Sequence, residues 1–434
     1  MLRKTLYALL PIFALAYHST LSQPAVASLS IADYGEDFKV KINYQYHLDS
    51  LYISQARTLP GMVQPLLFTQ GIKLAYGKAK GNLVLLGSQT YQVEGFASPD
   101  SCQLAIYKPG ATTPAGMLVV GPHLGIATSF AEAAKNLLDT LGTYLYNKSE
   151  LKTEAWQRFR NTIQQYGMFL QDDWEWFAAV NRAMRQLPFS HTNLSKMSFS
   201  TFIQQLNSQF EGERPVFLSF PKKEVALLQI SSFNGTGANI ARCMDTVIAQ
   251  GSRNLIIDLR NNTGGGAGAA MQLARYLSPV YVPAGALVTN KWFDTTQRLP
   301  TPADYSQFYT FSNGTTQQLI AALSKHAGLV LATSPSPRQF TGKIYILTSQ
   351  RTASTCEPLT YALQQRGHAT VIGSHTAGAM LSAAAYYLPF GFMVSLPVAD
   401  YYTYDGLRLE GHGVQPDIEC PPQQALERCL LLID

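Results

Sequence analysis

The stretch Lys343–Gly378, KIYILTSQRTASTCEPLTYALQQRGHATVIGSHTAG, decides the fold of the second half of the chain. The apolar run at 343–348 predicts a buried strand, 355–366 predicts an amphipathic helix, and 370–372 predicts a second buried strand. Ser354 therefore stands at a sharp turn from a strand into a helix. The free N–H groups and the positive dipole end of that helix would stabilise an oxyanion beside the serine hydroxyl, which suits acyl chemistry.

The same residues also allow a purely structural role for the serine. Ser354-Thr355-Cys356-Glu357 has the spacing of a capping box, in which the serine caps the helix and the glutamate reaches back to it. Pro358 fits the first turn, because N–H groups there have no intrahelical partner. Taken alone, the segment favours a helix cap over a nucleophile. Cys356 is interpreted as buried packing rather than as a reactive group.

The composition is that of an ordinary globular protein. With 434 residues, 46% of them hydrophobic and 14% charged, the chain can form a large core and two or three domains. The net charge of +5 is spread without long basic runs, so no binding to nucleic acid is expected. The five cysteines lack metal-ligand spacing, and Cys420 and Cys429 could pair in an oxidising compartment.

The N-terminus has the three-part layout of a secretory signal peptide. Arg3 and Lys4 precede the apolar run 6–17, and Ala25-Val26-Ala27 follows as a small-residue cleavage site. We therefore predict a signal peptide over residues 1–27 and an exported protein, periplasmic or extracellular. No later run is apolar for long enough to cross a bilayer, so stable membrane insertion is not expected.

The rest of the chain divides into three segments. Residues 28–126 show short apolar runs separated by turn residues, which predicts a small β-rich N-terminal domain. Residues 127–215 carry three amphipathic stripes and form a helical segment that contains Ser190 and His191. Residues 216–434 alternate strand and helix patterns, which predicts an α/β core.

Two features stand out within the α/β core. Residues 278–338 form a long insertion with one predicted helix near 317–325, and the insertion either borders a substrate cleft or only pads the fold. Gly264-Gly265-Gly266 lie between a strand and a helix, where glycines leave backbone N–H groups free to approach a ligand or an anion. No Gly-Lys-Ser or Gly-Lys-Thr follows, which excludes a P-loop.

Three motifs in this order resemble the C-terminal-processing (tail-specific) serine peptidases. They are LIIDLRNNTGGG at 255–266, TSQRTASTCEPLTYAL with GSHTAG at 348–378, and LEGHGVQPDI at 409–418. The resemblance runs from about Val225 to the C-terminus. It implies a ClpP/crotonase-like α/β core, Ser354 as the nucleophile, and a substrate that is a peptide or an unfolded protein tail. It implies neither a metal nor an organic cofactor.

The resemblance also bears on the catalytic base. The Ser-Lys branch of the family carries a lysine directly after the glycine of the T-x-G segment, and this chain has Ala379 there. The tricorn-like branch carries a Ser-His pair after the N-terminal helices and a glutamate in a C-terminal E-x-x-G motif. These positions match Ser190-His191 and Glu410. The resemblance to this branch implies His191 as the base, with Ser190 and Glu410 as a relay that stabilises charge.

Further expectations follow from the same resemblance. The N–H groups of Thr355 and of Gly264 or Gly265 would form the oxyanion hole. Three histidines in or near the matched motifs do not stand at base positions and are interpreted as structural or as cleft wall: His368, His375 and His412.

Two points concern domain content and function class. Many relatives insert a PDZ domain before the core, but about thirty residues separate His191 from Lys223, so none is expected here. Oligomers are possible. Because the fold does not guarantee the activity, a catalytically silent protein that binds a hydrophobic ligand or a peptide is the alternative function.

Overall fold

The computed structural model describes residues 23–47, 49–60, 62, 64–121, 129–197 and 215–433. They divide into two compact units, one within residues 1–127 that also includes 172–175, and one formed by the remainder. Most of the predicted signal peptide lies outside the described residues. Within the described ranges, no helix combines the length and the apolar character needed to span a membrane.

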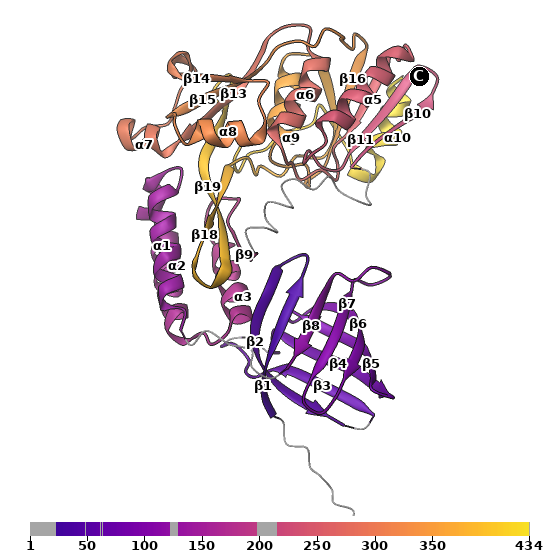
Figure 1. Cartoon of the computed structure of the whole chain (residues 1–434). Coiled ribbons are helices and arrows are strands. Elements are labelled where there is room, and N and C mark those ends of the chain that lie inside the picture. Colours follow the sequence, from indigo (N-terminus) through magenta and orange to yellow (C-terminus); the bar gives the residue numbers. More distant parts are fainter. Residues whose placement is uncertain are drawn as a thin grey trace, which may run out of the picture. The chain divides into compact units, whose positions relative to one another are not determined.

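The first unit is a closed antiparallel sheet (Figure 1, indigo to purple). Each strand pairs with the next, and β1 pairs with both β2 and β8, so no edge is left open. Side chains alternate between interior and exterior, as in β2, where Phe38, Val40 and Ile42 are fully buried. The strands are β1 (Gln23–Ile31), β2 (Gly35–Tyr46), β3 (Ser50–Gln55), β4 (Leu67–Ala75), β5 (Lys78–Leu85), β6 (Gln89–Ala97), β7 (Cys102–Tyr107) and β8 (Gly116–Val120).

The predicted cleavage site lies inside strand β1. Ala25 pairs with Ile42 of β2, and Ala27 pairs with both Val40 of β2 and Val120 of β8. A cut after Ala27 would therefore remove Gln23–Ala27 from the strand that closes the sheet.

Residues 172–175 complete the core of this first unit. Trp174 is fully buried, its indole N–H donates to the carbonyl of Leu66 at 3.2 Å, and its ring meets Phe38 edge to face. The carboxylates of Asp172 and Asp173 accept backbone N–H groups of β2. Acidic residues such as these are typical of a helix start, and helix α3 does begin at Asp173. Their burial in the sheet was not predictable from that local signal.

Three helices open the second unit, as the amphipathic stripes predicted. They are α1 (Ala131–Tyr144), α2 (Glu154–Phe169) and α3 (Asp173–Met184). Helices α1 and α2 approach closely at Gly167, where an added Cβ would lie 2.8 Å from the Cβ of Ala134. Phe130 stacks on Trp176 with ring centroids 5.3 Å apart, which ties α1 to α3.

A six-stranded sheet forms the α/β part of this unit, in the order β10-β11-β12-β16-β17-β20. All neighbours are parallel except β10 and β11. Its strands are β10 (Val216–Lys222), β11 (Val225–Ile230), β12 (Asn254–Asp258), β16 (Lys343–Thr348), β17 (Ala369–Gly373) and β20 (Ile418–Glu419). The central strands are buried on both faces, which explains their continuous apolar runs.

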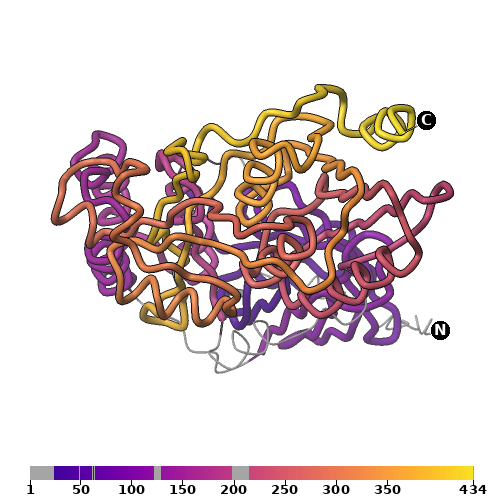
Figure 2. The backbone as a smooth tube through the Cα atoms, turned by 90° about the horizontal axis from the view of Figure 1, so that it is seen from above, coloured from indigo at the N-terminus to yellow at the C-terminus, as the bar shows by residue number. Residues whose placement is uncertain are grey.

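Helices cover both faces of the six-stranded sheet. One face packs on α5 (Gly237–Ala249), α6 (Ala267–Leu277) and α9 (Cys356–Gln365). The opposite face packs on α10 (Ala425–Ile433), which lies at the margin of the unit (Figure 2, yellow). The observed bounds of β16 and α9 agree with the sequence patterns to within about one residue.

A second sheet packs on the other side of α6 and α9 through Met271 and Tyr361. Its strands are β9 (Asn193–Lys196), β13 (Val282–Thr289), β14 (Tyr309–Ser312), β15 (Gly328–Thr333), β18 (Ser382–Tyr387) and β19 (Phe392–Thr403). The insertion 278–338 thus holds three strands, together with α7 (Asn290–Thr296) and the predicted helix, α8 (Thr316–Leu323). The expectation of a single helix there was incomplete, because β13 pairs with β19 far along the chain and a local pattern does not reveal such a partner.

The cysteines are free thiols in the described structure. Cys356 is fully buried in the core between the sheet and its helices, which confirms that it packs rather than reacts. Burial raises the pKa of its thiol. Cys420 and Cys429, a possible pair by sequence, are not joined.

Candidate active site

Ser354 occupies a strained turn between β16 and α9. Its φ is +55°, in the left-handed region that residues with a side chain seldom adopt. Its hydroxyl makes no hydrogen bond to any part of the chain that the structure describes. Helix α9 begins at Cys356 with Thr355 as its N-cap, and the N–H of Glu357 bonds the carbonyl of Ser354 rather than its side chain. The serine hydroxyl is therefore not used as a helix cap.

Glycines allow the backbone to approach Ser354 closely. A Cβ at Gly264 would lie 2.6 Å from the Cβ of Ser354, and one at Gly265 would lie 2.7 Å from the backbone nitrogen of Asn234. Both glycines have positive φ, at +106° and +130°. Any larger residue at 264 would thus collide with the serine.

The predicted oxyanion donors differ in availability. The N–H of Gly264 donates to Oδ1 of Asn262 at 2.8 Å, so it is already occupied. The N–H groups of Gly265 and Thr355 have no hydrogen-bond acceptor among the described residues. The Thr355 hydroxyl donates to the carbonyl of Gly265 at 2.7 Å and holds the two segments together. Of the two glycines, Gly265 has the free donor.

His191 lies in the turn that follows α3, with φ +61°. Its Nδ1 is 2.6 Å from Oγ of Ser190. The Ser190 hydroxyl donates to Oε2 of Glu410 at 3.0 Å, and the Ser190 backbone N–H donates to Oε1 at 2.8 Å. Because the hydroxyl proton is given to the carboxylate, the serine oxygen accepts from Nδ1–H of the imidazole. Nε2 of His191 is then left as a proton acceptor.

Burial of the imidazole lowers the pKa of His191 below its ordinary value, and the Glu410 carboxylate partly opposes this by favouring the charged ring. The imidazole is consequently neutral at a lower pH than an exposed histidine.

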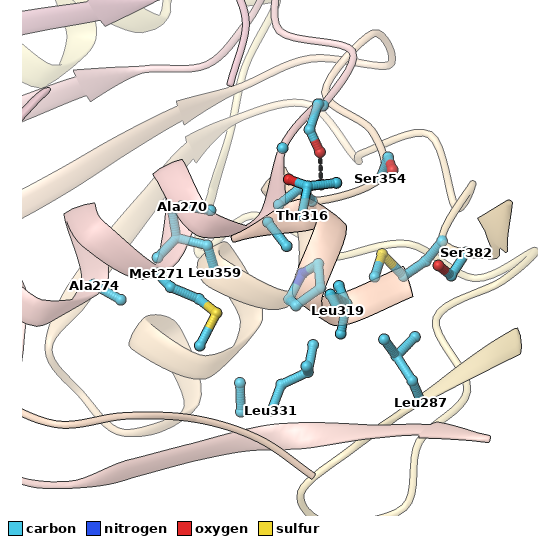
Figure 3. Close-up of a pocket in the computed structure, with 18 of the residues that line it drawn as sticks. Ala270, Met271, Ala274, Leu287, Thr316, Leu319, Leu331, Ser354, Leu359 and Ser382 are labelled. Atoms are coloured by element: carbon cyan, nitrogen blue, oxygen red, sulfur yellow. Dashed lines mark hydrogen bonds between the residues drawn. The ribbon is translucent and has the colours of Figure 1, made fainter. Parts of the chain in front are cut away.

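Ser354 and His191 line the same cavity, whose volume is about 710 Å³. Figure 3 shows this cavity with Ser354 at its border. Its walls are mainly aliphatic, with Leu287, Leu319 and Leu331 facing α6 and α9. Among the described residues of the lining, His191 alone carries a side chain that titrates as an acid or base, and none is a lysine. Residues of the insertion form a large part of the wall, so the insertion borders the cavity rather than only padding the fold.

Ala379 is in direct contact with the backbone of Ser354. Its carbonyl accepts the Ser354 N–H at 3.0 Å. A lysine at this position would start beside the serine, and the methyl group present cannot act as a base.

Two buried residues near Ser354 were missed by sequence reasoning. Glu357 was seen only as part of a capping box, yet its side chain is fully buried and accepts four hydrogen bonds. Asn262, also fully buried, orders the glycine turn through Gly264. The capping-box spacing was the one sequence signal that pointed to Glu357. The donors that bond its carboxylate lie about twenty residues further along the chain, and no local pattern reveals them.

Three further histidines of the α/β region lie outside the cavity lining. Nδ1 of His375 is 2.8 Å from the carbonyl of Thr376, and Nδ1 of His412 is 3.1 Å from the carbonyl of Glu410. Neither ring, nor that of His368, lines the cavity with Ser354. Their interpretation as structural residues is consistent with these positions.

Comparison with known proteins identifies the α/β region. Residues 224–420 match the model of peptidase family S41. The carboxyl-terminal-processing protease of Synechocystis sp. is 26% identical over 200 residues, which cover 46% of this chain and 38% of that protein. The carboxy-terminal processing protease CtpA of Bacillus subtilis is 23% identical over 205 residues, which cover 47% of this chain and 36% of that protein. The chain thus spans less than half the length of these curated relatives.

A solved structure shows the same fold over a longer range. The crystal structure of a candidate peptidase from Parabacteroides merdae aligns with a TM-score of 0.51 at 15% identity, over 71% of this chain and 97% of that chain. The family model and the curated relatives confirm the resemblance to the C-terminal-processing peptidases and the mixed α/β fold. The α/β region of this chain thus resembles the serine-type peptidases of family S41 over residues 224–420.

Proposed function

We propose that this chain is a serine peptidase that hydrolyses peptide bonds through an acyl-enzyme at Ser354, with Nε2 of His191 as the base. One observation carries the proposal. His191 is the one acid–base side chain among the described residues of the cavity beside Ser354, and Ser190 and Glu410 hold its other ring nitrogen. With Ala379 in place of a lysine, we assign the chain to the tricorn-like arrangement on a ClpP/crotonase-like core without a PDZ domain.

The chemistry follows from this geometry. Oγ of Ser354 attacks the scissile carbonyl carbon while Nε2 of His191 takes the hydroxyl proton. The N–H groups of Gly265 and Thr355 stabilise the oxyanion of the tetrahedral intermediate. The C–N bond then breaks as His191 returns its proton to the leaving amine. Water, deprotonated by the same nitrogen, attacks the ester and releases the acid product and free Ser354.

The cavity suggests the kind of peptide that binds. Its aliphatic walls suit an apolar side chain next to the scissile bond, because a charged side chain would lose its hydration there without gaining a partner. We propose peptides or unfolded protein tails with such residues as substrates.

We further propose that the protein is exported, on the basis of the basic start, apolar run and small residues at 3–27. Mass spectrometry of protein from a secreting host should give a mature N-terminus near Ser28, which would shorten β1 to its second half. An intact Met1 in the cytosol would exclude export.

The direct test uses a fluorophosphonate probe on the full chain. Labelling should occur at Ser354, located by peptide mass spectrometry, and should disappear together with peptidase activity in Ser354→Ala. Ser306→Ala, which removes an exposed hydroxyl outside the cavity, is the matched control and should be labelled normally. Peptide cleavage at the normal rate by a folded Ser354→Ala variant would refute the proposal.

A hydrophobic-ligand-binding protein is the second candidate function. The cavity favours it, since about 710 Å³ lies within the range of ligand pockets and exceeds the volume of one side chain. Saturable binding of an apolar fluorescent probe such as anilinonaphthalene sulfonate, with no labelling and no cleavage, would favour this function over the peptidase.

A further inference from the structure

The loop 376–380 is held from two sides by buried carboxylates. Glu357, on the first turn of α9, is fully buried, and Glu410 is 5% exposed. Two consecutive backbone N–H groups of the loop donate to different carboxylates. The N–H of Ala379 donates to Glu357 at 3.0 Å, and that of Met380 donates to Glu410 at 2.7 Å. The loop therefore joins the two carboxylates directly.

Glu357 links this loop to the nucleophile. Its Oε1 accepts from the Thr376 hydroxyl at 2.6 Å and from the Gly378 N–H at 2.7 Å. Its Oε2 accepts from Ala379 and, at 3.2 Å, from the N–H of Ser354. Four donors occupy the four lone-pair directions of one carboxylate, which offsets the cost of burying it. A residue that merely capped α9 would bond the helix rather than a loop about twenty positions away.

Glu410 links the same loop to the base. In addition to Met380, it accepts the backbone N–H and the hydroxyl of Ser190, whose oxygen contacts Nδ1 of His191. A continuous path of hydrogen bonds, each between 2.6 and 3.2 Å, thus runs from the Ser354 backbone through the loop to the imidazole.

We propose that Glu357 is a positioning residue, which through the loop 376–380 sets the approach of Ser354 to His191. The inference rests on the proposed function of this site. Ser354 has a left-handed backbone that α9 alone does not impose, and the bonds from Glu357 and from the carbonyl of Ala379 hold it there. Loss of the Glu357 carboxylate would let the serine shift relative to the base without touching either catalytic side chain.

The test compares variants of the full chain that differ by single atoms. Glu357→Gln replaces one acceptor oxygen by an NH₂ group that would face N–H donors. Thr376→Val keeps the shape of the side chain and removes its hydroxyl, whereas Thr376→Ser keeps the hydroxyl and removes a methyl group. Because a displacement of about 1 Å can cost about 10²-fold in rate, kcat should fall by about that factor in Glu357→Gln and by about tenfold in Thr376→Val. Substrate KM should stay within about twofold, and Thr376→Ser should restore kcat to within about threefold of the wild type.

Several readouts separate positioning from general stability. The thermal unfolding midpoint is measured on each variant, and the rate of fluorophosphonate labelling reports the reactivity of Ser354 itself. If Glu357→Gln fails to fold, the Thr376 pair decides the question. The inference is overturned if wild-type protein is labelled at Ser354 while folded Glu357→Gln or Thr376→Val reacts at the wild-type rate. If the wild-type protein is not labelled at all, it is the proposed function that fails.

Discussion

Ser190 bonds Glu410 twice, from its backbone N–H to Oε1 at 2.8 Å and from its hydroxyl to Oε2 at 3.0 Å, across 220 residues of sequence. The double contact orients the hydroxyl, so that its oxygen accepts from Nδ1–H of His191. The glutamate therefore acts on the imidazole through the serine. In the proposed mechanism, Glu410 favours the tautomer whose Nε2 is free, and it would stabilise the ring once protonated.

The pH dependence of the reaction should report this arrangement. The proposed mechanism needs neutral His191, and the pKa of this histidine lies below the ordinary value because the ring is buried. The acidic limb of kcat/KM should therefore have its midpoint below about 6.5, with activity rising as pH rises through it. A pH–rate profile of the full chain provides the measurement.

Glu410→Gln should move that limb further toward acid. The carboxylate favours the charged imidazole and raises the His191 pKa, so its removal lets the pKa fall further. The value of kcat should also drop, because the imidazolium formed in acylation loses its stabilising charge. An acidic limb that stays in place in a folded Glu410→Gln variant would contradict this link between Glu410 and His191.

The loss of activity should be larger when the proposed base, His191, is removed than when the hydroxyl that orients it is removed. His191→Ala should lower kcat by several orders of magnitude, because nothing else titratable among the described lining residues can accept the proton. Ser190→Ala should cost less, about 10- to 10²-fold, since it keeps the base but loses the bond that sets its tautomer. Single-turnover kinetics with circular dichroism as a folding control would measure both. Near-normal activity in folded His191→Ala would end the histidine mechanism.

The cavity should decide which peptides are cleaved. Ala274 lies at the end of the cavity lined by α6, and Ala274→Leu would fill part of that space. The value of kcat/KM should fall about tenfold or more for peptides with phenylalanine or leucine beside the scissile bond and change little for alanine. Ala249→Leu makes the same substitution at an exposed position of α5 and should leave the ranking of peptides intact. An equal loss for all peptides in Ala274→Leu would argue against this assignment.

The first unit should lose stability as pH rises from about 4 to about 7. Burial, with the nearby Glu175 carboxylate, raises the pKa of Asp172 to about 7. The folded state therefore retains a proton that the unfolded state has released, and the free energy of unfolding falls by up to about 4 kcal/mol across this range. Asp172→Asn should flatten the slope, whereas Asp100→Asn, at an exposed site of the same unit, should not.

Hydrogen exchange of the β2 amides of Lys39 and Lys41, normalised to an unstructured reference at each pH, would measure this effect in the first unit itself. Equal slopes in the wild type and in Asp172→Asn would mean that Asp172 does not keep its proton in the folded chain.

Local sequence patterns determined the elements that carry Ser354. The apolar run of β16 and the amphipathic period of α9 predicted a strand and a helix, and the turn between them placed Ser354, because these signals depend on residues close in the chain. The motif order pointed to the peptidase family whose model matches residues 224–420, and the alanine at 379 pointed away from a lysine base. The amphipathic stripes before His191 likewise predicted the three helices that precede it.

Only the tertiary structure decided how these parts meet. Contacts between residues far apart in sequence decide three features of the site. They decide whether Ser354 caps its helix, which of Gly264 and Gly265 has the free N–H, and which groups donate to Glu357. The strands of the insertion were hidden for the same reason, since β13 finds its partner β19 more than one hundred positions later. Propensity and periodicity depend on residues that are close in the sequence. The hydrogen-bond donors to a buried carboxylate, in contrast, come from residues that the folded core brings beside it, which can lie far away in the sequence.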